Sequence, residues 1–194
     1  METGRYTLHI ANKNYSSWSL RPWVLMKELG IEFNEQLIVF GDEPTWQAYR
    51  RLSPSGKVPC LTDESTTVWD SLAIIEYLAE RHEGVWPKNV KARAWARCAA
   101  AEMHSGFQSL RDICSMNVGL RIRMNTVSEG LQKDVDRIDS LWSHGLQQFG
   151  GPFLAGDRFS AVDAFFAPVV YRVRTYGLDL SEGAVLETGC VYLV

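Results

Sequence analysis

The sequence predicts an α/β domain built on a mixed four-stranded sheet, followed by an all-α domain. Residues 1–83 alternate short β-type segments with helical ones, whereas residues 90–194 carry helical periodicity and no convincing strand. The segment EGVWPKN at 83–89 contains a Gly and a Pro and is expected to link the two. A chain of 194 residues has room for two small domains of this kind.

The first elements read as β-α-β. Residues 5–11, RYTLHIA, alternate like a strand, and 32–39, EFNEQLIV, make a second one. Between them LRPWVLMKELG reads as an amphipathic helix, with Pro22 in its first turn and Gly30 closing it. Such a unit implies two parallel strands joined by a right-handed crossover.

The next elements read as β-β-α. One helical turn is expected at 44–50. Two short strands are then expected at 58–62 and 66–69, and they are antiparallel because the hairpin turn DEST joins them. From Ser71 the segment LAIIEYLAERH is expected to be a helix. The order βαβ-ββα is that of a thioredoxin-like domain.

Three segments of the second half are expected to be helical: 91–117, 127–149 and 160–176. The chain then ends in YGLDLSEGAVLETGCVYLV, whose Gly183 and Gly189 and apolar β-branched residues do not read as a helix. We therefore expect the all-α domain at 90–194 to be atypically short or truncated at its C-terminus.

Composition excludes several classes of function. The net charge is −3, and the sequence has no basic stripe with interleaved aromatics, so nucleic acid is not expected as a partner. No run approaches the roughly 18 apolar residues of a membrane span, and the N-terminus lacks the apolar stretch of a signal peptide, so a cytoplasmic protein is expected. The cysteines and histidines lack metal-ligand spacing, so no metal is expected.

The loop between the first strand and the first helix contains Ser16, Ser17, Trp18 and Ser19. Redox members of the thioredoxin-like class place C-x-x-C here, because a helix N-terminus lowers the pKa of a thiol. Without a thiol, disulfide exchange through this loop is excluded. A serine hydroxyl can instead donate a hydrogen bond to the thiolate of a bound ligand, which lowers the pKa of that thiol. The alternative is that these serines only cap the helix.

Two further motifs have the character of a peptide-holding site. If the bond before Pro59 is cis, the N–H and C=O of Val58 can pair with an extended peptide; an ordinary trans Pro is the alternative. Ser71 stands at a helix start whose N–H groups suit a carboxylate, and Asp70 suits an ammonium group. The alternative for this pair is simple capping.

Several segments resemble the glutathione S-transferase superfamily. GKVPCL at 56–61 and DSLAIIEYL at 70–78 resemble its glutathione-binding half, and YSSWSLRPWVLMKELGI resembles its serine-type active-site loop. The loop is most similar to the zeta, maleylacetoacetate isomerase-like pattern S-S-C-S-x-R, with Trp18 in place of Cys. RAWARCAAAEMHSGFQSLR at 93–111 resembles the first C-terminal helix of the family. FLAGDRFSAVDAFFAPVVYR at 153–172 resembles its buried capping box, in which Ser160 and Asp163 have a structural role.

The resemblance implies the glutathione transferase fold, with glutathione as cosubstrate. It makes Ser16 and Ser17 joint candidates for the hydroxyl that activates the glutathione thiol, without separating them. It places Val58 and cis-Pro59 beside the cysteinyl backbone of glutathione. It assigns Asp70 and Ser71 to the γ-glutamyl end of glutathione. Lys57 is a candidate for the glycyl carboxylate, with a solvated surface lysine as the alternative. Trp18 is a further glutathione-binding candidate, and its large ring is expected to alter or narrow the electrophile pocket.

A second-substrate pocket is expected next to His104, Gln108 and Arg111, which fall on one face of the predicted helix 91–117. A mixture of core, interface and surface roles is the alternative for these three. The resemblance implies a transferase whose bound thiolate attacks a small electrophile lodged against the α domain, in a family where homodimers are usual. The alternatives are a zeta-like glutathione-dependent cis–trans isomerase and a non-catalytic binding module. The first is distinguished by turnover of maleylacetoacetate without loss of glutathione.

Overall fold

The computed structural model describes residues 5–39 and 43–181, which form two compact units divided between Val85 and Trp86. We call residues up to Val85 unit 1 and those from Trp86 unit 2. The division falls inside the segment 83–89 that was expected to be a linker.

Unit 1 contains the four-stranded mixed sheet that the βαβ-ββα order predicted. Its elements are β1 (Tyr6–Ile10), α1 (Ser17–Glu28), β2 (Phe33–Leu37), α2 (Glu43–Leu52), β3 (Cys60–Asp63), β4 (Thr66–Trp69) and α3 (Ser71–Ala79). The strand order is β2-β1-β3-β4; β1 and β2 are parallel and the other two pairings are antiparallel. The thioredoxin-like fold class is therefore confirmed.

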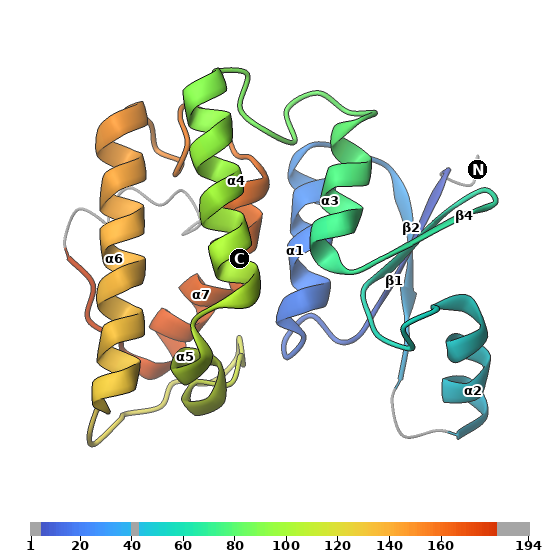
Figure 1. Cartoon of the computed structure of the whole chain (residues 1–194). Helices are drawn as coiled ribbons and strands as arrows, with labels where there is room; N and C mark the ends of the chain where they lie inside the picture. Colours follow the sequence, from blue (N-terminus) through green and yellow to red (C-terminus); the bar gives the residue numbers. More distant parts are fainter. Residues whose placement is uncertain (1–4, 40–42, 182–194) are drawn as a thin grey trace. The chain divides into compact units, whose positions relative to one another are not determined.

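Helices cover the sheet of unit 1. Figure 1 shows α1 and α3 side by side against one face of the sheet, and α2 on the other side. The core between them is aliphatic, because the central strands are apolar on the side that faces these helices. Its fully buried side chains include Leu8, Leu25, Leu61, Ile74 and Leu78.

Helix α1 begins earlier than its apolar periodicity suggested. Ser16 is the N-cap and accepts a hydrogen bond from the N–H of Ser19, so the helix starts at Ser17 instead of Leu20. The expectation that Pro22 lies in the first turn is wrong: it lies inside the helix, where it removes one intrahelical hydrogen bond. The C-terminal end is as expected. Gly30 has φ +65°, and the N–H of Ile31 donates to the C=O of Met26.

The segment after β2 also contains more helix than expected, since α2 has ten residues where one turn was anticipated. Its described C-terminal part carries Tyr49, which is buried against Ile38 and Cys60. The chain then turns into β3 with Gly56 at φ +64°. A Cβ at this position is strained, which explains the use of Gly.

Unit 2 is helical in its described part. It contains α4 (Val90–Ser105), α5 (Gln108–Ile113), α6 (Glu129–Phe149) and α7 (Ala161–Tyr176). Helix α7 packs on α4 and is buried almost all round, including Phe165 and Phe166, whereas α6 is amphipathic. The expected single helix 91–117 is wrong: α4 ends at Ser105, and Phe107 has φ +61°, which interrupts the helix before α5.

The start of α7 is a satisfied capping box, as expected. One carboxylate oxygen of Asp163 accepts from the N–H and the hydroxyl of Ser160, at 2.8 and 3.1 Å. Its other oxygen accepts from the N–H of Leu154 at 2.9 Å. Burial raises the pKa of Asp163 to about 6 despite these hydrogen bonds. Asp163 therefore holds the loop before α7 in place.

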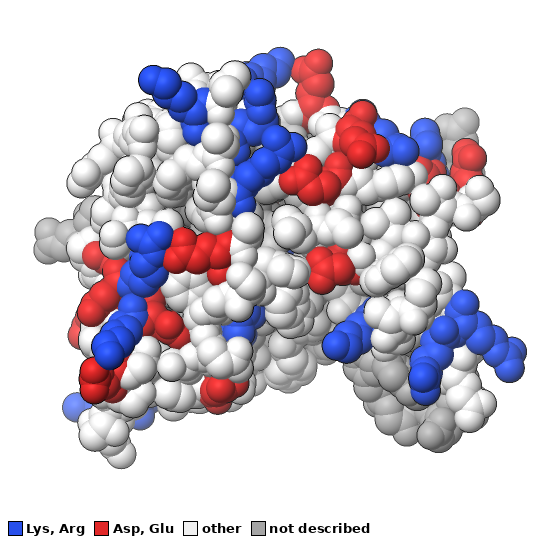
Figure 2. All heavy atoms as spheres, viewed as in Figure 1, with Lys and Arg blue, Asp and Glu red and all other residues white. Residues whose placement is uncertain are grey.

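On the face of the molecule in Figure 2, acidic and basic side chains are interspersed. No helix in the described ranges is long and apolar enough to cross a membrane. The C-terminal segment that was expected to end the all-α domain irregularly lies from residue 182 outside the described residues.

Candidate functional site

Strand pairing brings the three sequence motifs of unit 1 to one end of the sheet. In the β1–β3 pair His9 lies opposite Cys60, so the loop after β1 lies beside the residues that precede β3. In the β3–β4 pair Cys60 lies opposite Trp69, so the exit from β4 into α3 lies there too. The serine loop, Val58-Pro59 and Asp70-Ser71 are therefore neighbours in space, although about 40 residues separate the serine loop from Val58 and about a dozen separate Val58-Pro59 from Asp70-Ser71.

The serines at the start of α1 differ in what they do. Ser16 is partly exposed, and its oxygen accepts the Ser19 N–H while its hydroxyl donates to Ser19 Oγ at 2.9 Å. Ser19 is fully buried and accepts from the N–H of Ala11 at 3.1 Å, which ties the loop to the end of β1. Ser17 is the first helical residue and only 7% exposed. Both functions of the Ser16 hydroxyl are therefore used within the loop, and its O–H can reach a ligand by rotating out of the bond to Ser19.

The peptide bond between Val58 and Pro59 is cis, the isomer on which the peptide-binding hypothesis depended. Within residues 5–39 and 43–181, neither the N–H nor the C=O of Val58 has a hydrogen-bond partner. The side chain of Val58 is partly buried against the cluster of Ile38, Tyr49 and Cys60. Val58 thus presents a fixed main chain with an unused donor and acceptor, as an edge strand does.

The turn before Val58 is held by its own side chains. The C=O of Lys57 accepts from the hydroxyls of Tyr49 and Ser53, at 2.6 and 3.0 Å, and its N–H donates to Ser55 Oγ. The side chain of Lys57 is exposed. This arrangement fixes the main chain at Val58 and leaves the Lys57 ammonium at the surface.

Asp70 and Ser71 form the start of α3. Asp70 is the N-cap, with φ +75° and its carboxylate accepting from the N–H of Leu72 at 2.8 Å. A non-glycine residue with this φ is strained, and such strain is concentrated at functional sites. Ser71 is the first helical residue, and its side chain is fully buried. The exposed carboxylate of Asp70 thus stands beside N–H groups of the first helical turn, so the site offers one group for a cation and several for an anion.

One residue of this site was not singled out by the sequence analysis. Arg21, in α1, is fully buried, and its guanidinium lies 3.4 Å from Ser71 Oγ and 4.4 Å from the centre of the Trp18 ring. It links the start of α1 to the start of α3. The signal was present, since Arg21 is the last letter of the S-S-C-S-x-R pattern, but an Arg on a predicted amphipathic helix is ordinarily a surface residue.

The residues behind this sheet end are unsuited to nucleophilic chemistry. Cys60 directly follows Pro59, but it is fully buried and burial raises the pKa of its thiol. Burial also lowers the pKa of His9 and raises that of Tyr49 to about 12. All three are therefore neutral near pH 7, so none of these three side chains is a charged nucleophile there.

The three residues expected at a second-substrate pocket do not share one helix. His104 is in the last turn of α4, and its ring packs edge-on to Phe165. Gln108 begins α5 and donates to Asp112 at 2.7 Å. Arg111 donates to the C=O groups of Met103 and Gly106, at the end of α4, and burial lowers its pKa. The helix break at 106–107 thus separates the predicted face, and Arg111 stabilises the break.

In the described part of the chain, no three His, Cys, Asp or Glu side chains are grouped as metal ligands. Cys60, Cys98 and Cys114 are free thiols. Cys190 lies outside the described residues.

Comparison with known families gives two matches that together cover most of the chain. Residues 15–81 match the N-terminal domain of glutathione S-transferase, and residues 123–188 match its C-terminal domain. The first match contains the serine loop, Val58-Pro59 and Asp70-Ser71. The second begins in the connection before α6 and extends past α7.

Individual relatives have low identity but long coverage. Maleylacetoacetate isomerase of Rattus norvegicus is 26% identical over 93% of this chain and 84% of its own length. Glutathione S-transferase 1 of Dianthus caryophyllus is 25% identical over 96% of this chain and 86% of its own length. A glutathione transferase homologue from Burkholderia, solved with bound glutathione, superposes with a TM-score of 0.70 at 20% identity. The superposition covers 97% of this chain and 91% of that homologue. The structural likeness supports the fold.

Proposed function

Because the chain belongs to the glutathione S-transferase family, we propose that it binds glutathione at the sheet end of unit 1 and activates its thiol for attack on a small electrophile. The observation that carries the proposal is the unused N–H and C=O of Val58 beside cis-Pro59, on the same sheet end as Ser16 and Asp70. This main chain can pair with the cysteinyl residue of glutathione as an added strand.

The ends of glutathione would bind to the groups around Val58. Its γ-glutamyl part carries an α-ammonium and an α-carboxylate, which suit Asp70 and the N–H groups at the start of α3. Ser71 contributes a main-chain N–H to this set, while its side chain contacts Arg21, which adds positive charge behind the carboxylate. Lys57 is exposed near Val58 and would approach the glycyl carboxylate.

We assign thiol activation to Ser16, with Ser17 as the alternative. Ser16 is partly exposed and keeps a rotatable O–H, whereas Ser17 is 7% exposed. A hydrogen bond donated to the thiolate favours its charged form and lowers the pKa of the thiol, as does the nearby N-terminus of α1. The thiolate then attacks the electrophilic carbon, a C–S bond forms and the leaving group departs with its electron pair. Trp18 would line this side of the site, where it lies over Arg21.

A second function is favoured by the relatives and the loop pattern. Relatives from Rattus norvegicus, Mus musculus and Caenorhabditis elegans are named as maleylacetoacetate isomerases or probable ones. In the isomerase reaction the thiolate adds to a conjugated double bond, the new single bond rotates, and elimination returns glutathione. We keep His104, Gln108 and Arg111, which flank the α4–α5 break, as proposed contacts for the second substrate. Arg111 already donates to main-chain carbonyls, so it would have to exchange those bonds to contact a substrate.

The test uses one preparation and two substrates. The full chain is passed over immobilised glutathione, then assayed with 1-chloro-2,4-dinitrobenzene and with maleylacetoacetate. The transferase proposal expects retention and loss of free thiol with the aryl halide. The isomerase proposal expects turnover of maleylacetoacetate without consumption of glutathione. Retention without turnover of either substrate indicates the binding module, and absence of retention contradicts all three.

We also propose a cytoplasmic homodimer. Dimers are usual in the family to which the chain belongs. Sedimentation equilibrium would give a mass of twice 22.0 kDa for a dimer, and 22.0 kDa would contradict it.

A further inference from the structure

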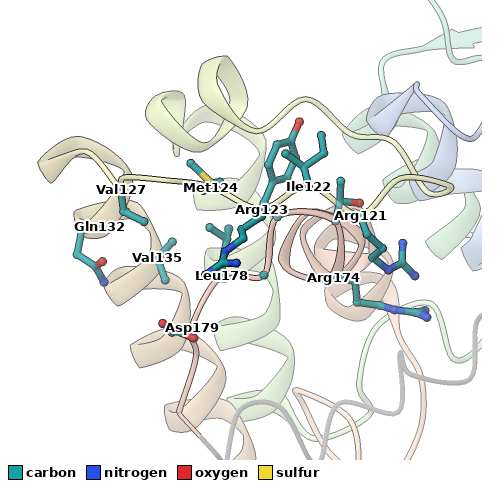
Figure 3. A pocket seen from close by; sticks show the side chains of 13 residues that line it. Arg121, Ile122, Arg123, Met124, Val127, Gln132, Val135, Arg174, Leu178 and Asp179 are labelled. Carbon is teal, nitrogen blue, oxygen red and sulfur yellow. The ribbon is translucent and has the colours of Figure 1, made fainter.

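A second hydroxyl lies directly behind that of Ser16, in the first turn of the same helix. It belongs to Ser19, which is fully buried and whose Oγ is 2.9 Å from Ser16 Oγ. The cavity of about 540 Å³ that Figure 3 shows is lined by residues of unit 2 alone, and none of them is a serine. A group that assists Ser16 is therefore sought at the start of α1.

The hydrogen bonds of Ser19 engage its oxygen but not its proton. Its Oγ accepts from the N–H of Ala11 at 3.1 Å, directly after β1, and from the hydroxyl of Ser16. Within residues 5–39 and 43–181, no hydrogen bond takes the proton of the Ser19 hydroxyl, and burial keeps water away from it. A buried donor without an acceptor costs free energy, so an arrangement that satisfies it is favoured.

Reversal of one hydrogen bond satisfies this proton. When the O–H of Ser16 turns away, the O–H of Ser19 can donate to Ser16 Oγ across the same 2.9 Å. The oxygen of Ser16 also keeps its bond from the N–H of Ser19 at 3.3 Å, so both of its lone pairs are used and its own proton faces a ligand. The donors then form a continuous chain from the N–H of Ala11 through Ser19 and Ser16 to the ligand.

We propose that Ser19 is a positioning residue for thiol activation, and that a thiolate bound at Ser16 reverses the Ser16–Ser19 hydrogen bond. This inference rests on the proposed function, because it needs a thiol bound at Ser16. In the free protein Ser16 donates to Ser19; in the thiolate complex Ser19 donates to Ser16, and Ser16 donates to the sulfur. Neither serine loses its proton, and the proton of the thiol goes to solvent. Ser19 does not touch the sulfur and acts through Ser16.

The experiment compares the wild type, Ser16→Ala, Ser19→Ala and the double variant, each as the full chain saturated with glutathione. It measures the pKa of the bound thiol from thiolate absorbance against pH. Ser19→Ala should raise this pKa by about 0.3–0.6 unit, because each bond in a chain strengthens its neighbour by about 10–30%. The double variant should have the thiol pKa of Ser16→Ala, since Ser19 acts only through Ser16. Ser19→Thr, which keeps the hydroxyl, should restore the wild-type value.

Removal of the Ser19 hydroxyl also removes a tether of the loop, and Glu35→Gln is the matched control for that effect. Glu35 forms an ion pair with Lys13 and thereby ties the same loop to β2. Glu35→Gln weakens this tie and removes a negative charge, which can only lower the pKa of a nearby thiol. We therefore expect no rise of the thiol pKa in this variant.

A second measurement needs no substitution at residue 19. The N–H of Ala11 is the far end of the chain, so its nuclear magnetic resonance shifts in the wild-type complex should change through the pKa of the bound thiol. In Ser16→Ala this step should vanish, whereas a through-space effect of the thiolate charge would persist. The measurement stands even when Ser19→Ala does not fold.

An unchanged thiol pKa in Ser19→Ala, beside a raised one in Ser16→Ala, would overturn the role of Ser19 and leave the proposed function standing. Additive effects in the double variant, an equal rise in Glu35→Gln, or an Ala11 step that persists in Ser16→Ala would overturn it as well. A wild-type complex with the thiol pKa of free glutathione would contradict the proposed function, and the role of Ser19 with it.

Discussion

The starts of α1 and α7 use the same type of residue in different surroundings. Each helix begins after a serine N-cap, Ser16 in unit 1 and Ser160 in unit 2. Ser160 is 2% exposed, and its partner Asp163 is 1% exposed with both carboxylate oxygens engaged. Ser16 is partly exposed, and its O–H donates to Ser19 Oγ, a bond that it can exchange for one to a ligand.

We infer that burial distinguishes a cap that only stabilises its helix from one that a ligand can reach. A buried cap without a free donor or acceptor can only stabilise its helix. A partly exposed cap, next to an unused peptide group such as that of Val58, can also serve a ligand.

Asp163→Ala should have the largest effect, and on stability. It leaves the buried N–H groups of Leu154 and Ser160 without an acceptor, at about 1–3 kcal/mol each. We expect a loss of about 3–5 kcal/mol of unfolding free energy in urea titrations followed by circular dichroism. The glutathione affinity of the folded fraction should not change. A loss below about 1 kcal/mol would mean that the box is not structural.

The pH dependence of stability should also report on Asp163. Burial raises its folded pKa to about 6, above the unfolded value, so the folded state binds more protons than the unfolded state between these two values. The contribution of this group to stability is therefore full at low pH and decreases as pH rises through about 6. Asp163→Asn should flatten this slope in urea titrations from pH 4 to 7. An unchanged slope would show that Asp163 ionises normally.

Ser16→Ala should raise the pKa of bound glutathione thiol by about 1–2 units, because a hydrogen bond to a charged group contributes about 1.5–3 kcal/mol. Loss of the cap should also cost about 1 kcal/mol of stability. The thiol pKa is measured from thiolate absorbance against pH. Ser16→Thr, which keeps the hydroxyl, should retain most of the effect. If Ser17→Ala raises the thiol pKa and Ser16→Ala does not, the assignment passes to Ser17.

Asp70→Asn should have the smallest effect. Asn keeps an N-cap oxygen for Leu72 but removes the charge that would attract the α-ammonium of glutathione. We expect the Kd for glutathione to rise about tenfold, since a charge-assisted hydrogen bond becomes a neutral one. The Kd for deaminated glutathione should not change. Calorimetry with both ligands checks this, and an equal change for both would place the ammonium elsewhere.

Local chemistry explains which parts were predictable from sequence. The βαβ-ββα order and the Ser160–Asp163 box follow from periodicity and short-range capping, so both were predicted. The α4–α5 break was missed because Arg111 stabilises it by bonds to carbonyls of another helical turn. The buried position of Arg21 depends on tertiary packing, which periodicity does not encode.

The central claim is that the sheet end at Ser16, Val58 and Asp70 binds glutathione and lowers the pKa of its thiol. The most direct test is a pH titration of thiolate absorbance for glutathione bound to the wild-type protein. The account predicts a saturable complex whose thiol pKa lies at least one unit below the free value of about 8.5. A complex with the free value, or no complex at millimolar glutathione, would contradict it.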